Sequence, residues 1–336
     1  MTDNTISLCM IVKNEEAHIE QCLKSVHDIV DEIVIVDTGS TDQTVEICKK
    51  YTKNIHSFQW NQNFSEARNE SIQRAKSKWI LWLDGDEELD RENIDNLKAA
   101  LSQKKEEAIL YVPIINYIGK SVQEEDAYNI YQPRIFRNGK KLVFQNRIHE
   151  TLEIPNAGLV EDTLDVPIKH YGYLDSFKTS KKKHDRNLSL LKIELNNEKH
   201  SPWVEYHAAS EYYNAKNYEK AFHFVNYAIL KFIEHGLIPP AIVYRLKYAI
   251  LIDSNNIDGA WPSINQAILL YPDYVDLYYI KGTVLFHLKK YEEAVEALDQ
   301  CLKLGEDNHK YLILKGAGSF RATELKEQCL EQLTVK

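Results

Sequence analysis

The chain of 336 residues is long enough for two or three compact domains. Apolar residues make up 44% of it and charged residues 27%, which is typical of globular proteins and argues against disorder. The formal charge of −9 at pH 7, with no basic stripe along the sequence, argues against a nucleic-acid partner.

Short apolar runs of strand length alternate with helical patterns up to about residue 118. Strands are expected at residues 6–12, 32–37, 54–60, 79–84 and 108–114, and helices at 15–27, 42–51, 64–76 and 91–102. This alternation implies right-handed crossovers and predicts an α/β domain with a mostly parallel, covered sheet. Ligands bind such sheets at the carboxyl ends of the strands, where Asp37 and Asp84 fall.

Past residue 130 the pattern changes. Short strands on either side of Asn138-Gly139 predict a hairpin added to the sheet. A long polar helix is expected from about Asp175 to Glu198, and it leaves the first domain. The expected organisation is a first domain at 1–175, a linking helix at 176–200 and a second domain at 201–336.

Small residues recur at a regular spacing in the second domain. Ala260 and Ala294 lie 34 residues apart, which is the period of the tetratricopeptide repeat. Ala221 and Ala260 lie 39 residues apart, so the middle repeat carries an insertion. We predict an all-α domain of about three tetratricopeptide-like helix pairs, which serve either as structural packing or as a surface for docking or dimerisation.

Two aspartates follow the strongly apolar strand at 79–83. Residues i and i+2 of an extended backbone project to one side, so Asp84 and Asp86 can face the same ion. Gly85 between them lets a bulky ligand approach the backbone closely. Carboxylates suit a hard divalent cation such as Mg²⁺ or Mn²⁺, which in turn binds a diphosphate. The alternative is a solvated acidic turn, which the position after a buried strand disfavours.

Asp37 ends an earlier strand and precedes a helix. Its carboxylate can accept hydrogen bonds from a ribose or a base, or it can merely begin a turn. No glycine completes a GxGxxG or GxxxxGK motif, which disfavours dinucleotide-binding and P-loop folds. Arg134 and Arg137 either neutralise phosphate or lie on an exposed strand.

Four segments, in order along the chain, carry a resemblance to a known family. They are CMIVKNEEAHIEQCLKSV, EIVIVDTGSTDQT, NFSEARNESIQRAKSKWILWLDGDEEL and QNRIHETL. Over roughly residues 6–175 the chain resembles the family 2 glycosyltransferases, which are inverting enzymes of the GT-A fold. With helical repeats behind such a domain, and with RIHE and KHYGY, it is similar to the sublancin-type bacteriocin glycosyltransferases, which attach sugar to a peptide cysteine or serine. Lipopolysaccharide-core and other sugar transferases share those two short motifs.

The resemblance implies roles for residues on the donor side. The nucleotide base would be lined by Ile11, Val12, Lys13 and Asn14. Asp37 would bind the nucleoside, and Arg68 would reach the sugar or the phosphate.

The resemblance also implies a metal site and a base. Asp84 and Asp86 would hold the metal and the diphosphate, and His170 would add a further contact, unless it is only a histidine satisfied beside a strand. Members of the family often have a pair of acidic residues at the place where this sequence has His149-Glu150. Of these two we take Glu150 as the candidate general base.

Location is predicted from three absences in the sequence. Residues 1–12 carry no positive segment of a signal peptide, and the longest apolar run, 108–118, is too short to span a bilayer. The five cysteines are scattered and form no CxxC pair, which favours buried free thiols in a reducing compartment. We therefore expect a cytoplasmic protein with no membrane span.

The predicted function is metal-dependent, inverting transfer of a hexose from a UDP-sugar such as UDP-glucose. The acceptor would be a cysteine or serine of a bacteriocin-type peptide, with a saccharide or lipopolysaccharide-core acceptor as the alternative. The repeats would recognise the acceptor, pair two copies in a homodimer, or both. A non-catalytic scaffold is the rival from another class, and a sugar nucleotidyltransferase is disfavoured because no glycine-rich basic loop follows the first strand.

Overall fold

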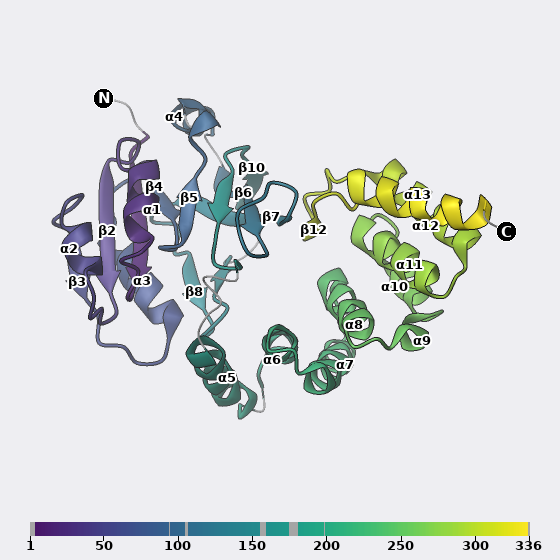
Figure 1. The fold of residues 1–336 in the computed structure, drawn as a ribbon. Helices are drawn as coiled ribbons and strands as arrows, with labels where there is room; N and C mark the ends of the chain where they lie inside the picture. Colours follow the sequence, from purple (N-terminus) through teal and green to yellow (C-terminus); the bar gives the residue numbers. More distant parts are fainter. Residues whose placement is uncertain are drawn as a thin grey trace. The chain divides into compact units, whose positions relative to one another are not determined.

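The computed structural model describes residues 4–93, 95–104, 107–154, 159–174, 181–197 and 199–334. The chain forms two compact units (Figure 1). The first unit comprises Met1–Glu124 and Ile130–Thr179, and the second, which we call the helical unit, comprises Glu125–Asn129 and Ser180–Lys336. The predicted domain boundary at 175–176 lies outside the described residues.

The first unit is built on a mixed sheet with the strand order β3-β2-β1-β4-β7-β6-β11-β5. Its strands are β1 (Ile6–Val12), β2 (Glu32–Asp37), β3 (Ile55–Ser57), β4 (Trp79–Trp82), β5 (Glu87–Leu89), β6 (Glu107–Tyr117), β7 (Ala127–Arg137), β10 (Val160–Thr163) and β11 (Ile168–His170). Strands β1 to β4 are mutually parallel, as predicted, whereas β7 runs antiparallel to β4 and β5 antiparallel to β11. The α/β fold class is confirmed.

Helices cover both faces of this sheet (Figure 1). They are α1 (Ile19–Val26), α2 (Thr44–Cys48), α3 (Phe64–Arg74) and α4 (Asp95–Gln103), with a short 3₁₀ turn at Arg91–Asn93. On one face Met10 packs in a core with Leu23 of α1, and on the other Cys9 packs with Ile80 and with Ile72 of α3. Burial on both faces explains why β1 and β4 read as continuous apolar runs and not as alternating patterns.

The predicted hairpin around Asn138-Gly139 is wrong in its pairing. Strand β7 does join the sheet, but beside β4, and the chain after the turn leaves it. Strand β8 (Val143–Gln145) pairs instead with β9 (Thr151–Glu153) in a separate two-stranded sheet. The turn is formed as expected, with Gly139 at a φ of 78°. Turn chemistry is local, whereas the choice of partner strand depends on distant residues.

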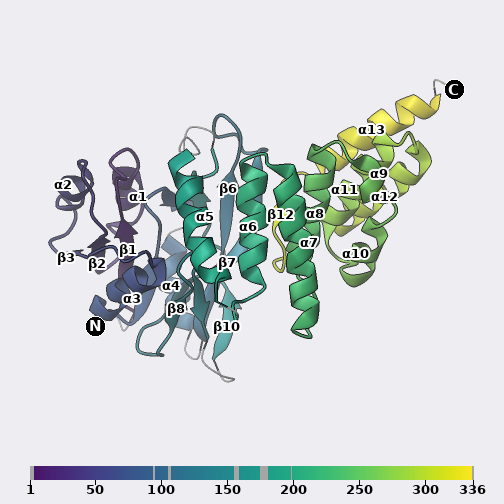
Figure 2. The same ribbon diagram turned by 90° about the horizontal axis from the view of Figure 1, so that it is seen from below.

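Helix pairs make up the helical unit (Figure 2). Its elements are α5 (Lys181–Leu195), α6 (Trp203–Asn214), α7 (Tyr218–Glu234), α8 (Ala241–Asp253), α9 (Ile257–Ala260), α10 (Ile264–Leu270), α11 (Val275–His287), α12 (Tyr291–Leu304), α13 (Phe320–Thr334) and the short strand β12 (Ile313–Leu314). Residues 176–180 and 198 of the predicted linking helix lie outside the described residues.

The recurring small residues of this unit lie where helices meet. All three anchor alanines, Ala221, Ala260 and Ala294, are fully buried. A Cβ added to Gly282 would come within 2.8 Å of Leu298, so α11 and α12 touch there. In the middle repeat Pro262, which lacks an N–H, separates α9 from α10. No helix among the described residues is long and apolar enough to cross a membrane.

Candidate active site

The acidic residues of the first unit lie at the carboxyl ends of neighbouring parallel strands. Strand β2 ends at Asp37, and β1, which lies between β2 and β4, ends at Val12. Asp84 follows the last residue of β4, Trp82, by two positions. The sheet therefore brings the predicted nucleotide and metal residues to one edge, as the strand pattern implies.

Asp84 is held at both its backbone and its side chain. Its Oδ1 accepts a hydrogen bond of 2.8 Å from Arg68 Nη2, and its backbone N–H donates to Glu87 Oε2 at 2.8 Å. The other carboxylate oxygen of Glu87 accepts from Arg134 Nη2 at 2.5 Å. Burial alone would raise the pKa of Asp84, but the charges of Arg68 and Arg134 outweigh it and lower the pKa. Asp84 is therefore an ionised carboxylate.

Arg68 joins Asp84 to the candidate base. While its Nη2 donates to Asp84, its Nε donates to Glu150 Oε1 at 2.8 Å. The guanidinium lies 4.4 Å from the ring centroid of Trp82 and 5.6 Å from that of Phe144. This one side chain couples two carboxylates that are 66 positions apart in sequence, 84 and 150. Two ion pairs and two aromatic faces fix its orientation.

Helix α3 also holds the loop that carries Glu150. Asn69, one position after Arg68, accepts from the backbone N–H of Phe144 at 2.7 Å and donates to its carbonyl at 2.9 Å. At the start of the helix the N–H of Phe64 donates to the Arg147 carbonyl at 2.9 Å. The segments NFSEARN and QNRIHE are therefore in direct contact, a link that spacing alone did not predict.

His149 and Glu150 differ in backbone setting. His149 has a φ of 54°, in the left-handed region that non-glycine residues seldom occupy. Such strain persists where surrounding contacts enforce it, and it is common at functional sites. The Glu150 side chain is 12% exposed, so its carboxylate retains some access to solvent while it contacts Arg68.

Asp86 faces His170 across a narrow gap. His170 Nε2 lies 3.7 Å from Asp86 Oδ2, and its Nδ1 lies 2.8 Å from Asn116 Oδ1. If Asn116 accepts this hydrogen bond, Nδ1 carries a proton, and Nε2 faces Asp86, protonated when the ring is charged and with a free lone pair only when it is neutral. A Cβ on Gly172 would come within 2.6 Å of His170 Nε2 and would collide with Asp86. Only glycine leaves this space open.

The donor set at this gap fits a divalent cation. Among the described ranges, no three or more His, Cys, Asp or Glu side chains are grouped so that they could hold a metal ion. Asp86 and His170 nevertheless offer one oxygen and one nitrogen to the space beside Gly172, a combination that suits Mn²⁺ as well as Mg²⁺ with a diphosphate completing the shell. Burial lowers the pKa of His170, but the Asp86 carboxylate 3.7 Å away and the nearby carboxylates of Glu87 and Asp84 outweigh it and raise the pKa. A cation bound at this gap would have to compete with a proton on His170.

The loop after β1 is tied to the loop after β2. Asn14 has a φ of 56°; its N–H donates to Ser40 Oγ at 3.1 Å, and its side chain accepts from the Thr41 N–H at 2.8 Å. Asp37 accepts from the backbone N–H groups of Gly39 and Ser40 at 3.3 Å and 3.0 Å. The Asp37 carboxylate thus stabilises a turn, which is one of the two alternatives from the sequence. Its binding of a nucleoside, the other alternative, stays a prediction.

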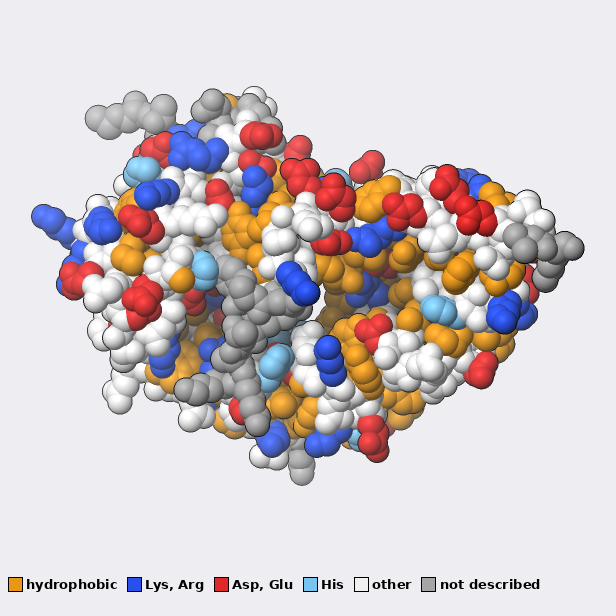
Figure 3. Space-filling model, in the orientation of Figure 1, with side chains coloured by type: hydrophobic (Ala, Val, Ile, Leu, Met, Phe, Trp, Pro, Cys, Tyr) orange, Lys and Arg blue, Asp and Glu red, His pale blue; other side chains and the backbone are white. Residues whose placement is uncertain are grey.

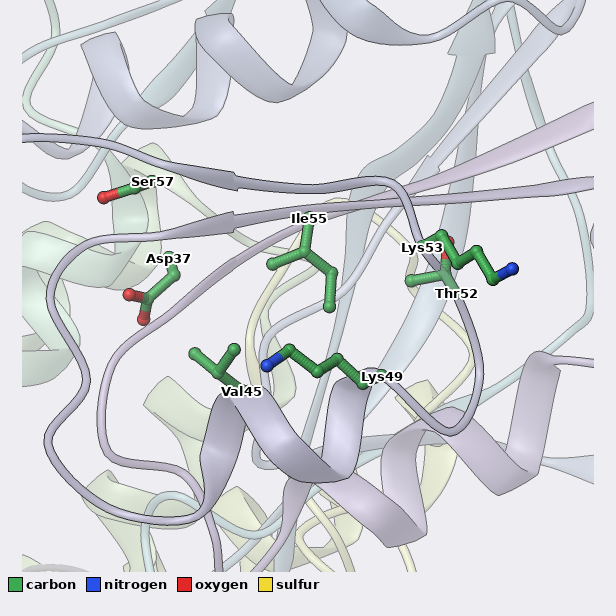
Figure 4. A pocket seen from close by; sticks show the side chains of 7 residues that line it. All are labelled: Asp37, Val45, Lys49, Thr52, Lys53, Ile55 and Ser57. Carbon is green, nitrogen blue, oxygen red and sulfur yellow. The ribbon is translucent and has the colours of Figure 1, made fainter.

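A pocket of about 560 Å³ lies beside Asp37 (Figure 4). It is lined by Asp37, Val45, Lys49, Thr52, Lys53, Ile55 and Ser57. In Figure 4 the Lys49 side chain extends from α2 along this pocket, with Ile55 above it. Its ammonium group is paired with Glu46 at 2.6 Å. Asp37 alone among the predicted site residues contributes to this pocket, which is separate from the Asp84–Asp86 cluster.

Two residues of the site were not predicted from the sequence. No motif in the sequence assigns a role to Glu87 or to Asn116. Glu87 does carry a signal, because it lies two positions before the apolar Leu89 in an extended segment and so falls on the same, buried side. Asn116 carries none, since its partner His170 is 54 residues away.

The fold is the one expected of a glycosyltransferase domain, and the comparisons with known proteins agree. Residues 7–155 match glycosyl transferase family 2, and residues 275–308 match the tetratricopeptide repeat. The chain therefore carries a family 2 glycosyltransferase domain with a tetratricopeptide repeat behind it, which confirms the predicted domain family and enzyme class.

The chain is similar to particular known proteins to different extents. Glycosyltransferase SunS of the Bacillus subtilis SPbeta prophage is 29% identical over 84% of this chain and 67% of that protein. A TPR repeat-containing protein of Synechococcus elongatus is 35% identical over 50% of this chain, but the match spans only 42% of that protein. The crystal structure of S. aureus TarS 1–349 superposes with a TM-score of 0.41 at 16% identity, covering 74% of this chain and 84% of that one.

Proposed function

We propose that the chain transfers a hexose from a UDP-sugar, with inversion and with a divalent cation, to an acceptor side chain. The observation that carries this proposal is the arrangement around Arg68, which joins the carboxylate of the donor side, Asp84, to that of the acceptor side, Glu150. An inverting displacement needs the leaving group and the attacking group on opposite sides of one carbon, each served by its own residues.

On the donor side, Asp86 and His170 would hold the cation, with Asp84 as the third ligand that the sequence predicts. Bound there, Mg²⁺ or Mn²⁺ would offset the negative charge on the leaving diphosphate. Asp84 and Glu150 pair with Arg68, and Glu87 pairs with Arg134. Asp86 adds a fourth carboxylate beside His170, so carboxylates outnumber guanidiniums in this cluster and a cation would help to balance their charge. The nucleoside would lie at Asp37 and along Ile11, Val12, Lys13 and Asn14, at the adjoining strand ends.

On the acceptor side, Glu150 would take the proton from the attacking group. Its position is set by Arg68 and by the contacts that α3 makes with its loop. A positioned base of this kind contributes about 10²- to 10⁴-fold to the rate. His149, in the strained position beside it, is the second candidate.

The acceptor we propose is a peptide cysteine or serine, and a saccharide is the alternative. The resemblance to the sublancin-type enzymes and the likeness to SunS support a peptide. The helical unit would capture the acceptor or pair two copies of the chain. Apolar side chains remain exposed on this unit, among them Leu230, Ile233, Leu237, Ile238 and Leu269. Figure 3 shows apolar side chains interspersed with charged ones on one face of the molecule.

The experiment is a donor and acceptor screen with the full chain. UDP- and GDP-sugars are offered with MnCl₂, MgCl₂ or EDTA, together with peptides in matched cysteine and serine versions and with oligosaccharides. Release of UDP and a hexose mass on a peptide, both lost in EDTA, is the expected result. Transfer to saccharides alone would replace the peptide acceptor. Absence of nucleotide release from every donor would contradict the proposal.

A further inference from the structure

A buried ion pair lies directly behind the acidic loop. The two side chains, Glu87 on β5 and Arg134 on β7, are 0% and 4% exposed, and their charged atoms are 2.5 Å apart. The second oxygen of the Glu87 carboxylate accepts the backbone N–H of Asp84 at 2.8 Å. One carboxylate thus fastens the first aspartate of the acidic loop to the strand beside it.

The pair continues into the rest of the site. The guanidinium of Arg134 lies 3.6 Å from the ring centroid of Trp82, the same ring that Arg68 approaches to 4.4 Å. Trp82 is in turn fixed by a hydrogen bond of 2.9 Å from its Nε1 to the Pro133 carbonyl. A continuous chain of contacts therefore runs from Arg134 through Glu87, Asp84 and Arg68 to Glu150.

Stability alone does not account for this pair. Removing two charges from water costs about as much as their attraction returns, so an apolar pair of similar volume often packs as well or better. Arg134 also has two guanidinium nitrogens, Nε and Nη1, that are buried with no hydrogen-bond partner among the described residues. A pair optimised only to hold β7 in the sheet would not leave these donors unmet.

We propose that Glu87 and Arg134 are positioning residues for the donor site. They hold the backbone of Asp84, from which the turn to Asp86 begins, and through Arg68 the side chain of Glu150, in the geometry that metal-dependent binding of the diphosphate requires. The inference rests on the proposed function, since it concerns how the same site binds its donor. Residues that orient metal and diphosphate ligands typically change metal affinity 10- to 100-fold when they are removed.

Strand β7 supplies a matched control. Arg137 lies three positions after Arg134 on the same strand and lies over Trp79, at the other end of β4, with its guanidinium 4.1 Å from the ring centroid. Trp79 and Arg137 are partners in the β4–β7 ladder. Arg137→Met therefore removes the same kind of stacked arginine from the same two strands, away from the acidic loop.

The test uses the full chain as wild type, Glu87→Gln, Arg134→Met and Arg137→Met. Each is titrated with UDP in MnCl₂ and in EDTA by calorimetry, and its thermal unfolding is recorded. We expect Glu87→Gln and Arg134→Met to weaken UDP binding in MnCl₂ at least about tenfold. Binding in EDTA should be unchanged in both, and Arg137→Met should stay within about twofold of wild type under either condition.

Glu87→Gln decides the matter if Arg134→Met does not fold. Glutamine has nearly the same shape but only one acceptor oxygen, so it can serve either Arg134 or the Asp84 N–H and not both. Folded Glu87→Gln protein that binds UDP and MnCl₂ as wild type does would overturn the positioning role. Equal losses in Arg137→Met would also overturn it, by showing a general effect on the sheet. If wild type itself shows no manganese-dependent UDP binding, the proposed function fails and the inference fails with it.

Discussion

At the scale of single residues, Glu150 is the side chain whose role depends most on the acceptor. A cysteine thiol has an ordinary pKa of about 8.5, so a fraction of it is already ionised at neutral pH. A serine hydroxyl is not ionised there and needs a base to take its proton as it attacks. Glu150→Gln should therefore slow transfer to serine by about 10²- to 10⁴-fold and transfer to cysteine much less.

The measurement is a pair of peptides that differ only in cysteine or serine, assayed with both enzymes across pH. Raising the pH should rescue the mutant with the thiol peptide alone, because only the thiol ionises in that range. Equal losses on the two peptides would assign Glu150 a positioning role, and no loss on either would move the base to His149.

Gly172 offers a test of the gap between Asp86 and His170. An added Cβ would collide with Asp86 and lie 2.6 Å from His170 Nε2, so Gly172→Ala should remove manganese-dependent UDP binding by closing the space. The matched control is Gly282→Ala in the helical unit, where the new Cβ would meet Leu298 at 2.8 Å. Calorimetric titration should show loss in the first variant only, although both melt at lower temperature. Retained binding in Gly172→Ala would place the cation elsewhere.

At the scale of elements, α3 determines how firmly the base is held. Its residue Asn69 makes two hydrogen bonds to the backbone of Phe144, each worth about 0.5–1.5 kcal/mol. Asn69→Ala should lower the free energy of unfolding by about 1–3 kcal/mol and reduce kcat, while the KM for the donor changes little, because Asp84 and Asp86 stay in place.

The control on the same helix is Glu70→Gln. Glu70 pairs with Arg74 at the surface, where such ion pairs contribute little. Denaturant unfolding and steady-state rates for both variants separate the two effects. An equal change in kcat for Glu70→Gln would contradict the role of Asn69 in holding the loop of Glu150. A rise in donor KM with unchanged kcat for Asn69→Ala would contradict it too.

The elements also show what sequence can and cannot predict. Strands β1 and β2 were predicted with their observed ends, because an apolar run bounded by polar residues is a local pattern. The partner strand of β7 was not predicted, because its pairing with β4 joins residues more than 50 positions apart. The contact of Arg68 with Glu150 spans 82 positions, so the sequence indicated each of the two segments but not the contact between them.

At the scale of the whole molecule, the site residues all belong to the first unit, so the helical unit should be separable from donor binding. Arg245 and Asp276 form a buried ion pair in the helical unit, with Nε and Oδ2 2.7 Å apart. Asp276 also accepts the N–H of Leu314 at 3.0 Å. Arg245→Met leaves this carboxylate buried without its counter-charge, which typically costs about 3–5 kcal/mol.

Calorimetric melting of Arg245→Met should show destabilisation of the helical unit, and titration with UDP and MnCl₂ should match wild type well below the melting temperature. Weaker acceptor binding is the further expectation if the repeats capture the acceptor. If UDP binding were lost when the helical unit unfolds, the assignment of the donor site to the first unit alone would be contradicted.

The account centres on the claim that Asp86 and His170 hold a cation for the diphosphate, and Asp86→Asn tests it most directly. The amide keeps the size of the carboxylate and removes its charge. Titration of wild type and Asp86→Asn with UDP, in MnCl₂ and in EDTA, is the decisive measurement. The account predicts that manganese strengthens UDP binding in wild type and has no effect in the variant, with the two proteins alike in EDTA and similar in melting temperature. UDP affinity unchanged both by the substitution and by EDTA would contradict it.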